Sequence, residues 1–418
     1  MTARPTRLFA LVLAAGALAV AGCAPSQSGT GSNAGSDSDS DTTATGDAAG
    51  GEEAAGSVKV GIIYSETGPL AAYGQQFKEG LEAGLDYATD GTGEVDGTQI
   101  ELTYRDDAGN PDTAVAAAKD LIGQEYKIMG GTVVSGIAVA MAEQAEQNQV
   151  LYISGPAATD QTTGANEYTF RSGRQSLQDV ATAAAFLPDE GDNKIVVLAQ
   201  DNAFGQGNFA AVQAVLGADG DEVTSVLVPE DATEFTSFAR QVIDAEPDLI
   251  FVAWAGASAG NMWQSLEQQS VFDVAPVVTG LGDSATFGAY GPVADKISFL
   301  NHYFPGATDN EANTALVEHV EAAGGTPDLF TNDGFVMGQM IVQAVGEGGG
   351  EDVNAMIEAL EGWEFEGPKG TLTIREGDHA LLQPMFTVQL NQDGEAWVPE
   401  LLDTIPADQV APPEASGR

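Results

Sequence analysis

The fold is decided by residues 129–160, which read MGGTVVSGIAVAMAEQAEQNQVLYISGPAATD. Two short apolar runs in this stretch are separated by a helical pattern, so they predict parallel strands whose carboxyl ends face the same edge of a sheet. Small residues follow both runs: Ser135 and Gly136 after the first, and Ala157, Ala158 and Thr159 after the second. Ligands bind at this edge of open α/β sheets, because backbone N–H groups and short hydroxyls can approach closely there. The stretch therefore predicts half of a clamp for a small molecule.

The same alternation continues on both sides of this stretch. Short β-rich runs alternate with amphipathic segments from Val58 onward, and the alternation restarts after residues 168–171. This pattern predicts an α/β fold of two doubly wound, Rossmann-like lobes joined by a hinge that the chain crosses several times. A length of 418 residues, 43% of them hydrophobic, is enough for two such cores. Small-molecule sites concentrate in the cleft between lobes.

The expected boundaries lie where the pattern changes. The first lobe is expected to comprise residues 58–172 with 304–384, and the second 173–303 with 385–405. Residues 406–418 are rich in Pro and Ala and are expected to form a loose tail.

The N-terminal residues predict export and anchoring. Residues 1–23 combine two Arg, an apolar run and small residues before Cys23, which is the architecture of a secretory signal peptide. A cysteine at that place resembles a bacterial lipobox, in which the cysteine carries the lipid anchor. An ordinary signal peptide and an uncleaved anchor are the alternatives. Residues 24–57 are almost wholly small and acidic, so they predict a disordered tether between the outer face of the cytoplasmic membrane and the folded body.

Composition argues against several other kinds of function. The chain has 62 acidic and 15 basic residues, a net charge of −47, so it repels phosphate backbones and no nucleic-acid partner is expected. Cys23 is the only cysteine and the three histidines are widely separated, so no metal site is expected. Residues 205–207, Gly-Gln-Gly, lack the third glycine of a dinucleotide fingerprint, and no cofactor is expected.

One motif favours an enzyme instead. Residues 256–260, GASAG, match the nucleophile elbow G-x-S-x-G around Ser258, after a predicted strand and before a predicted helix. Such patterns of small residues are common in a chain with 51 glycines, and no Gly-rich oxyanion loop follows an early strand. An esterase-like hydrolase is therefore the alternative interpretation, and a binding protein that is not an enzyme is the leading one.

Five short strings follow one another along the chain: TGPLAAYG at 67–74, PAAT at 156–159, FR at 170–171, DNAFGQG at 201–207 and FEGPKG at 365–370. With the Ser135 exit and the lipobox, they resemble the ABC-transporter solute-binding proteins of the branched-chain amino-acid type, over residues 58–402. The resemblance implies the type I periplasmic binding protein fold. It also implies an amino acid-like solute as ligand and the permease subunits of an ABC importer as partners.

The resemblance further implies roles for individual residues. The position of Ser135 would supply a hydroxyl to a ligand carboxylate, that of Ala157 a backbone contact, and that of Thr159 both an N–H and a hydroxyl. Neutral donors bind an anion without burying a countercharge. The remaining positions expected at the ligand are Gly136 and Ala158 beside these donors, Tyr73 above the ligand, and the wall residues Phe204, Trp254 and Phe330.

Two departures from the family leave the ligand open. The acid that receives an ammonium group in the family falls near Gly282, with Asp283 next to it, and Ala257 stands where the family has a Tyr. If Asp283 does not reach the cleft, the ligand need not be an amino acid, and Arg174 could meet a carboxylate bidentately. Aliphatic amino acids, aromatic acids and amides all remain candidates.

Each residue also has a structural alternative. Ser135 and Thr159 could cap helices, and the three wall residues could pack in the core. A ligand-binding sensory module is the third functional interpretation.

Overall fold

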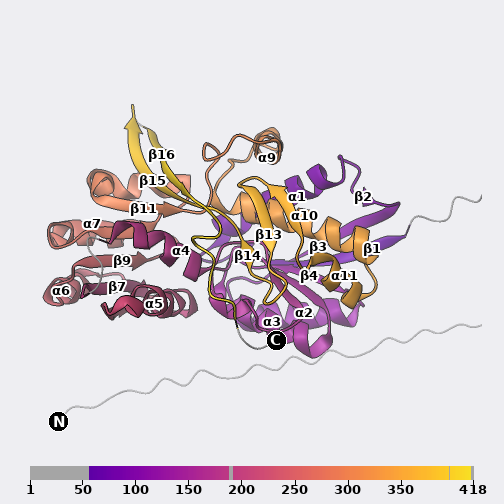
Figure 1. The fold of residues 1–418 in the computed structure, drawn as a ribbon, viewed down its shortest axis with the longest axis horizontal. Helices are drawn as coiled ribbons and strands as arrows, with labels where there is room; N and C mark the ends of the chain where they lie inside the picture. The colour runs from indigo at the N-terminus through magenta and orange to yellow at the C-terminus, as the bar shows by residue number, and fades with distance from the viewer. Residues whose placement is uncertain (1–55, 188–191, 395, 416–418) are drawn as a thin grey trace, which may run out of the picture. The chain divides into compact units, whose positions relative to one another are not determined.

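The computed structural model describes residues 56–187, 192–394 and 396–415. Cys23, the predicted signal peptide and all but the last two residues of the predicted tether lie outside the described residues. The described chain contains a six-stranded, a seven-stranded and a three-stranded sheet (Figure 1). No helix in these ranges is both long enough and apolar enough to cross a membrane.

The six-stranded sheet is the centre of the first lobe, with the strand order β2-β3-β1-β4-β5-β6. All neighbours in it are parallel except β2 and β3. Every residue of β4 and β5 is buried, as expected for parallel strands covered on both faces. The strands are β1 (Ser57–Tyr64), β2 (Glu94–Val95), β3 (Thr98–Asp106), β4 (Ile128–Gly131), β5 (Leu151–Ser154) and β6 (Thr169–Arg171).

Two glycine-bearing helices, one early and one late in the chain, pack against each other in this lobe. A Cβ atom on Gly80 of α1 would lie 1.9 Å from the carbonyl oxygen of Thr331 in α10, so only glycine permits this approach. The late segment thus returns to the first lobe. Besides the six-stranded sheet, the first lobe contains α1 (Ala71–Ala88), α2 (Pro111–Gly123), α3 (Ser135–Asn148), α9 (Glu311–Ala322), α10 (Leu329–Gly348), α11 (Val353–Leu360), β12 (Glu364–Gly367), β13 (Gly370–Ile374) and β14 (Leu381–Leu382).

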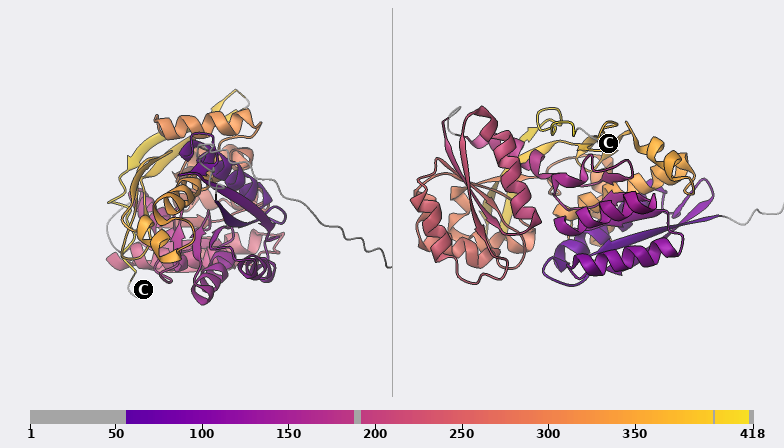
Figure 2. Two further views of the ribbon diagram at one scale, coloured as in Figure 1. Left: turned by 90° about the vertical axis from the view of Figure 1, so that its right-hand side faces the viewer. Right: turned by 90° about the horizontal axis from the view of Figure 1, so that it is seen from below.

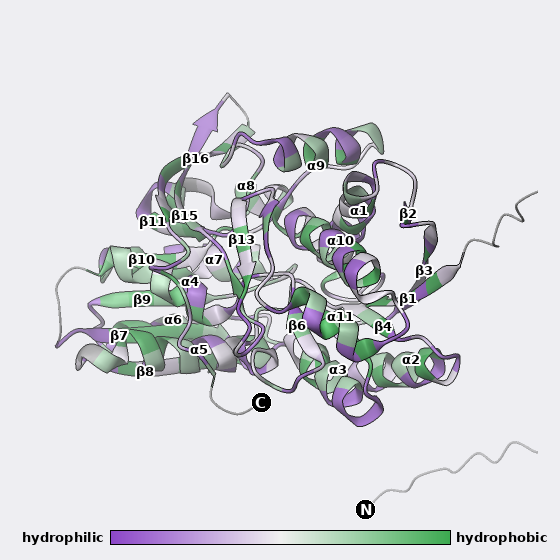
Figure 3. Ribbon diagram, turned by 45° about the vertical axis from the view of Figure 1, so that its right-hand side comes forward, coloured by the Kyte–Doolittle hydropathy of each residue, from purple (hydrophilic) through white to green (hydrophobic). Residues whose placement is uncertain are grey.

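The seven-stranded sheet is the centre of the second lobe, with the order β16-β15-β11-β10-β9-β7-β8. Its strands are β7 (Lys194–Gln200), β8 (Glu222–Val228), β9 (Leu249–Ala253), β10 (Val277–Gly280), β11 (Ile297–Asn301), β15 (Met385–Asp393) and β16 (Ala396–Ile405). The interior strand β9 is hydrophobic along its whole length (Figure 3). Helices α4 (Ser176–Ala183), α5 (Ala203–Val215), α6 (Thr236–Asp244), α7 (Ala259–Gln268) and α8 (Phe287–Tyr290) complete the lobe.

From β1 to β16, the chain passes between the lobes at three places: between β6 and α4, between β11 and α9, and between β14 and β15. Figure 2 shows the consequence, since elements from residues 200–300 form one group, and the orange helices of the later chain lie with the indigo and purple elements in the other.

The C-terminal segment makes a fourth passage, which corrects the expectation of a loose tail. After β16, the carbonyl of Pro412 accepts a hydrogen bond from Nη1 of Arg375 (2.8 Å), and the amide of Ala415 donates one to Oδ2 of Asp378 (2.9 Å). Val410, two residues before Pro412, is fully buried. The prolines have no N–H group to satisfy, and Arg375 supplies the donors that their carbonyls need, so residues 406–415 are held against the first lobe.

Candidate ligand-binding cleft

A cavity of about 330 Å³ lies between the two lobes and is lined by residues of both. Its lining includes seven of the residues that the sequence predicted at the ligand: Tyr73, Ser135, Gly136, Ala158 and Phe330 from the first lobe, and Phe204 and Trp254 from the second. Three predicted residues do not line it: Ala157, Thr159 and Asp283.

The N-termini of two helices meet across the cleft. Ser135 and Gly136 begin α3, and a Cβ atom on Gly136 would lie 3.7 Å from Cβ of Ala203, the first residue of α5 in the other lobe. The first-turn N–H groups of a helix have no partner within the helix and carry partial positive charge. This part of the cleft therefore favours negatively charged or hydrogen-bond-accepting groups of a ligand.

Aromatic rings form the walls of the cleft. The rings of Tyr73 and Phe330 are 4.6 Å apart between centroids, and the ring of Trp254 lies edge-on to Phe235 at 5.4 Å. Burial raises the pKa of the Tyr73 hydroxyl, while a backbone hydrogen bond from Gly256 of the second lobe acts in the opposite direction. Tyr73 therefore contributes both to the wall and to the contact between lobes.

Arg171 explains why Ala157 and Thr159 do not line the cleft. This side chain is 1% exposed, and its guanidinium donates to the carbonyls of Ala157 (2.9 Å) and Thr159 (3.1 Å). The hydroxyl of Thr159 accepts from the amide of Gln161, which caps a short 3-10 helix. Ala157 and Thr159 thus fix the loop after β5 through bonds made away from the cavity, while Ala158 between them lines the cavity.

Asp283 is likewise used as a cap. Its Oδ1 accepts a hydrogen bond from the amide of Thr286 (3.1 Å), and the neighbouring amide of Ser284 donates to Asp328 of the first lobe (2.7 Å). Burial raises the pKa of Asp283. Gly282, not Asp283, lines the cavity, so Asp283 is not placed to receive a ligand ammonium group directly.

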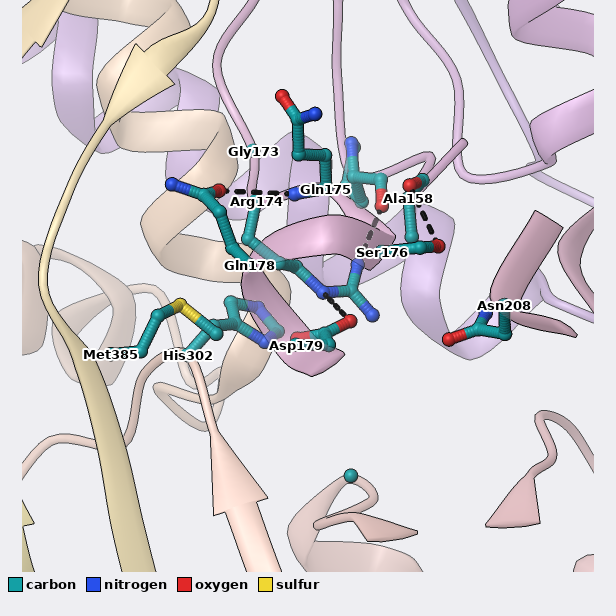
Figure 4. Close-up of polar contacts among 12 residues, drawn as sticks. Ala158, Gly173, Arg174, Gln175, Ser176, Gln178, Asp179, Asn208, His302 and Met385 are labelled. Carbon is teal, nitrogen blue, oxygen red and sulfur yellow. Dashed lines mark hydrogen bonds and ion pairs between the residues drawn. The ribbon is translucent and has the colours of Figure 1, made fainter. Parts of the chain in front are cut away.

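Arg174 does reach the cleft, in contact with an acid that the sequence did not single out. Its Nη1 donates to the carbonyl of Pro156 (2.9 Å), and its Nε lies 3.4 Å from Oδ2 of Asp179 (Figure 4). Both Arg174 and Asp179 line the cavity, and burial raises the pKa of Asp179 while Arg174 opposes that effect. Within the described residues, Nη2 of Arg174 makes no hydrogen bond. A carboxylate could therefore bind this end of the guanidinium.

The candidate nucleophile Ser258 is placed for a structural role. Its hydroxyl accepts a hydrogen bond from Nε1 of Trp254 (3.1 Å). The histidines have other partners: His302 lies at the Leu329 carbonyl (3.2 Å), His319 at Asp86 (3.3 Å), and His379 at the Thr169 carbonyl (2.9 Å). No cluster of three or more His, Cys, Asp or Glu suited to a metal occurs in the ranges that the structure covers.

Comparison with known proteins gives a consistent result. Residues 57–395 match the family model described as periplasmic binding protein. Leu/Ile/Val-binding protein homolog 3 of Brucella melitensis is 28% identical over 345 residues, which are 81% of this chain and 92% of the relative. A solved ABC-type branched-chain amino acid transporter protein from Rhodopseudomonas palustris is 32% identical, with a TM-score of 0.73 over 86% of this chain and 100% of the other.

A second solved structure shares the fold at lower identity. It is a solute-binding protein of an ABC transporter from R. palustris in complex with 4-hydroxybenzoate, 22% identical with a TM-score of 0.76, covering 84% of this chain and 97% of the other.

Proposed function

The chain belongs to the periplasmic binding protein family, and on this premise we propose that it captures a small organic carboxylate with an apolar body and delivers it to the permease of an ABC importer. The family comprises extracytoplasmic solute-binding proteins, not enzymes, and the fold is the type I fold of two α/β lobes.

The observation that carries the proposed ligand class is the position of Arg174. It is the Arg or Lys side chain of the cavity lining, and its Nη2 makes no hydrogen bond within the described residues. Aliphatic and aromatic side chains such as Leu70, Phe204 and Trp254 dominate the rest of the lining, which also includes the acids Asp179 and Glu230. A cation set in an apolar cleft suits a carboxylate on an apolar body. Relatives named for Leu, Ile and Val and a structure named for 4-hydroxybenzoate point to ligands of the same general form.

The proposed contacts come from both lobes. Ser135 and Gly136, at the start of α3, and Ala158 hold the carboxylate end with Arg174. The rings of Tyr73, Phe330, Phe204 and Trp254 cover the apolar body. Ala157, Thr159 and Asp283 support this arrangement through the loops that they cap or hold.

Closure of the lobes is the proposed response to the ligand. A ligand that touches both lobes binds the closed arrangement better than an open one and therefore shifts the population toward it. The moving parts would be residues 58–172 with 304–384 and residues 173–303 with 385–405. Lipidation of Cys23, with residues 24–57 as tether, would keep the binding protein at the outer face of the membrane near its permease.

The test begins with the ligand that the protein carries. Mass spectrometry of small molecules released by denaturation identifies it, and thermal unfolding with leucine, isoleucine, valine, benzoate, 4-hydroxybenzoate and acetamide ranks the classes. A ligand at about 100 times its dissociation constant adds about 2.7 kcal/mol to the free energy of unfolding. We expect stabilisation by at least one carboxylate and its loss in Arg174→Gln. Stabilisation by the neutral amide alone would overturn the proposed ligand class.

A further inference from the structure

Asn301 has an unusual position on the cavity lining. It is the last residue of β11 and is 2% exposed, yet neither Nδ2 nor Oδ1 of its amide has a hydrogen-bond partner within the described residues. Buried side-chain amides are nearly always paired, because an unpaired donor or acceptor in a low-dielectric site is unfavourable. An amide of this kind on the wall of a binding cleft is available to a ligand.

The other neutral polar side chains of the second-lobe lining already have protein partners. The amide of Gln200 both donates to and accepts from the backbone of Ala255 (3.2 and 3.1 Å). The hydroxyl of Thr279 donates to the carbonyl of Val252 (2.8 Å), and Nδ2 of Asn208 donates to the carbonyl of Phe204 (2.9 Å). These bonds hold the ends of the strands and the start of α5. Among the described residues, the side-chain amide of Asn301 makes no such bond.

The chemistry of an amide limits what can satisfy it. Nδ2 needs an acceptor and Oδ1 needs a donor. A carboxylate offers acceptors only, and an ammonium group offers donors only. A hydroxyl or a primary carboxamide offers both and can satisfy the two atoms at once.

We propose that Asn301 determines specificity by recognising a neutral hydroxyl or carboxamide group on the ligand, in addition to the carboxylate assigned to Arg174. The inference rests on the proposed function, because it concerns the same cleft. The ligand is then polar at two places and apolar between them, which distinguishes it from a plain aliphatic amino acid or benzoate.

Matched probes test this directly. Isothermal titration calorimetry would compare benzoate with 3-hydroxybenzoate, 4-hydroxybenzoate and 4-carbamoylbenzoate, and valine with its isostere threonine. The wild type is expected to bind at least one hydroxyl or carboxamide probe about tenfold or more tighter than its parent, since sites built to bond such a group reject ligands without it. In Asn301→Leu this ratio should fall to about one. The probe that gives the largest ratio tells whether the group is a hydroxyl or a carboxamide.

Two controls keep the outcome decisive. Thermal unfolding of ligand-free Asn301→Leu is expected to show stability equal to or above the wild type, because a side chain of similar size replaces an unpaired amide. Asn301→Asp, which keeps an acceptor but loses the donor, should lose the preference even if the leucine variant folds poorly. Asn391→Leu, the same substitution on an exposed part of β15 in the same sheet, should leave all ratios unchanged.

The possible results distinguish a failure of the proposed function from a failure of the role assigned to Asn301. If no carboxylate probe binds the wild type, the proposed function is wrong and the inference falls with it. If parent compounds bind as tightly as their hydroxyl and carboxamide derivatives, or if the ratio persists in Asn301→Leu and Asn301→Asp, the role of Asn301 is wrong while the proposed function stands.

Discussion

Nε of Arg174 lies 3.4 Å from Oδ2 of Asp179, and both side chains are nearly buried on the wall of the cleft. The pair places a positive and a negative group side by side where a ligand must bind. An anionic ligand is attracted by Arg174 but repelled by Asp179, whereas a zwitterionic ligand can be attracted by both residues.

The Arg174–Asp179 pair therefore predicts opposite effects on two ligand classes. Asp179→Asn should strengthen binding of benzoate by about 1 kcal/mol and weaken binding of leucine by a similar amount, since a charged hydrogen bond is lost. Titration calorimetry of both ligands measures the difference, with Asp179→Glu as the matched control that keeps the charge. Equal changes for both ligands would contradict this account of the pair.

Ser135 and Thr159 should respond differently to the same substitution. Ser135→Ala removes a hydroxyl from the cleft and should weaken ligand binding by about 1–3 kcal/mol. Thr159→Ala removes a cap away from the cavity and should lower the free energy of unfolding by about 1 kcal/mol while the dissociation constant stays unchanged. Urea unfolding and calorimetry on both variants separate the two roles. An affinity loss in Thr159→Ala without a stability loss would show that the residue contacts the ligand.

His302 predicts a specific dependence of stability on pH. Burial lowers its pKa well below the usual value, and Arg174 and Lys369 add to this effect, although Oδ2 of Asp333 lies 3.7 Å away. Below pH 6.5 the unfolded chain therefore binds a proton at this position that the native state does not bind, so stability falls as pH falls.

The control for this dependence is His302→Gln, which keeps a hydrogen-bond donor and does not titrate. Between pH 7.5 and 5 the melting temperature of the wild type should drop more than that of the variant, by an amount that grows with acidity. Parallel curves for the two proteins would show that His302 is not the group responsible.

The C-terminal segment should depend on Arg375. This side chain donates to the carboxylate of Asp378 at 2.8 and 2.6 Å as well as to the carbonyl of Pro412. Burial raises the pKa of Asp378, but the hydrogen bonds that its carboxylate accepts, above all from Arg375, outweigh burial and leave the pKa below its usual value. Arg375→Ala should lower the free energy of unfolding by about 2–4 kcal/mol, because it leaves a buried carboxylate without its countercharge. Hydrogen exchange should become faster in residues 406–415. Arg240→Ala, at an exposed position of α6, serves as control; unchanged exchange in both would show that Arg375 does not hold the tail.

The fold class and the family were predictable from the sequence because both have strong signals. Strands such as β9 are continuous apolar runs, and the helices between them have clear periodicity, so the two-lobed α/β fold is confirmed. The elements that were not predicted lack such signals. Helix α11 is only eight residues long, and β16 mixes acids with apolar residues on an exposed edge.

The site was harder to predict, because side-chain direction depends on partners distant in sequence. The string PAAT identified a loop that borders the cavity, but only Ala158 of its last three residues lines the cavity. Arg171, which turns the other two carbonyls away, is recognisable in sequence only as part of a family string. Asp179 reads as an ordinary polar position of an amphipathic helix, and Asn301 as the end of an apolar strand.

The attachment of residues 406–415 means that both ends of the described chain lie on one lobe. Residue 57 begins β1, and Ala415 is bonded to Asp378, although the last strand belongs to the other lobe. Fluorophores fused close to the two ends would therefore move together and report little when the lobes close. An optical sensor built from this protein needs one label on the second lobe, for which Glu246, exposed in the turn after α6, is a suitable position.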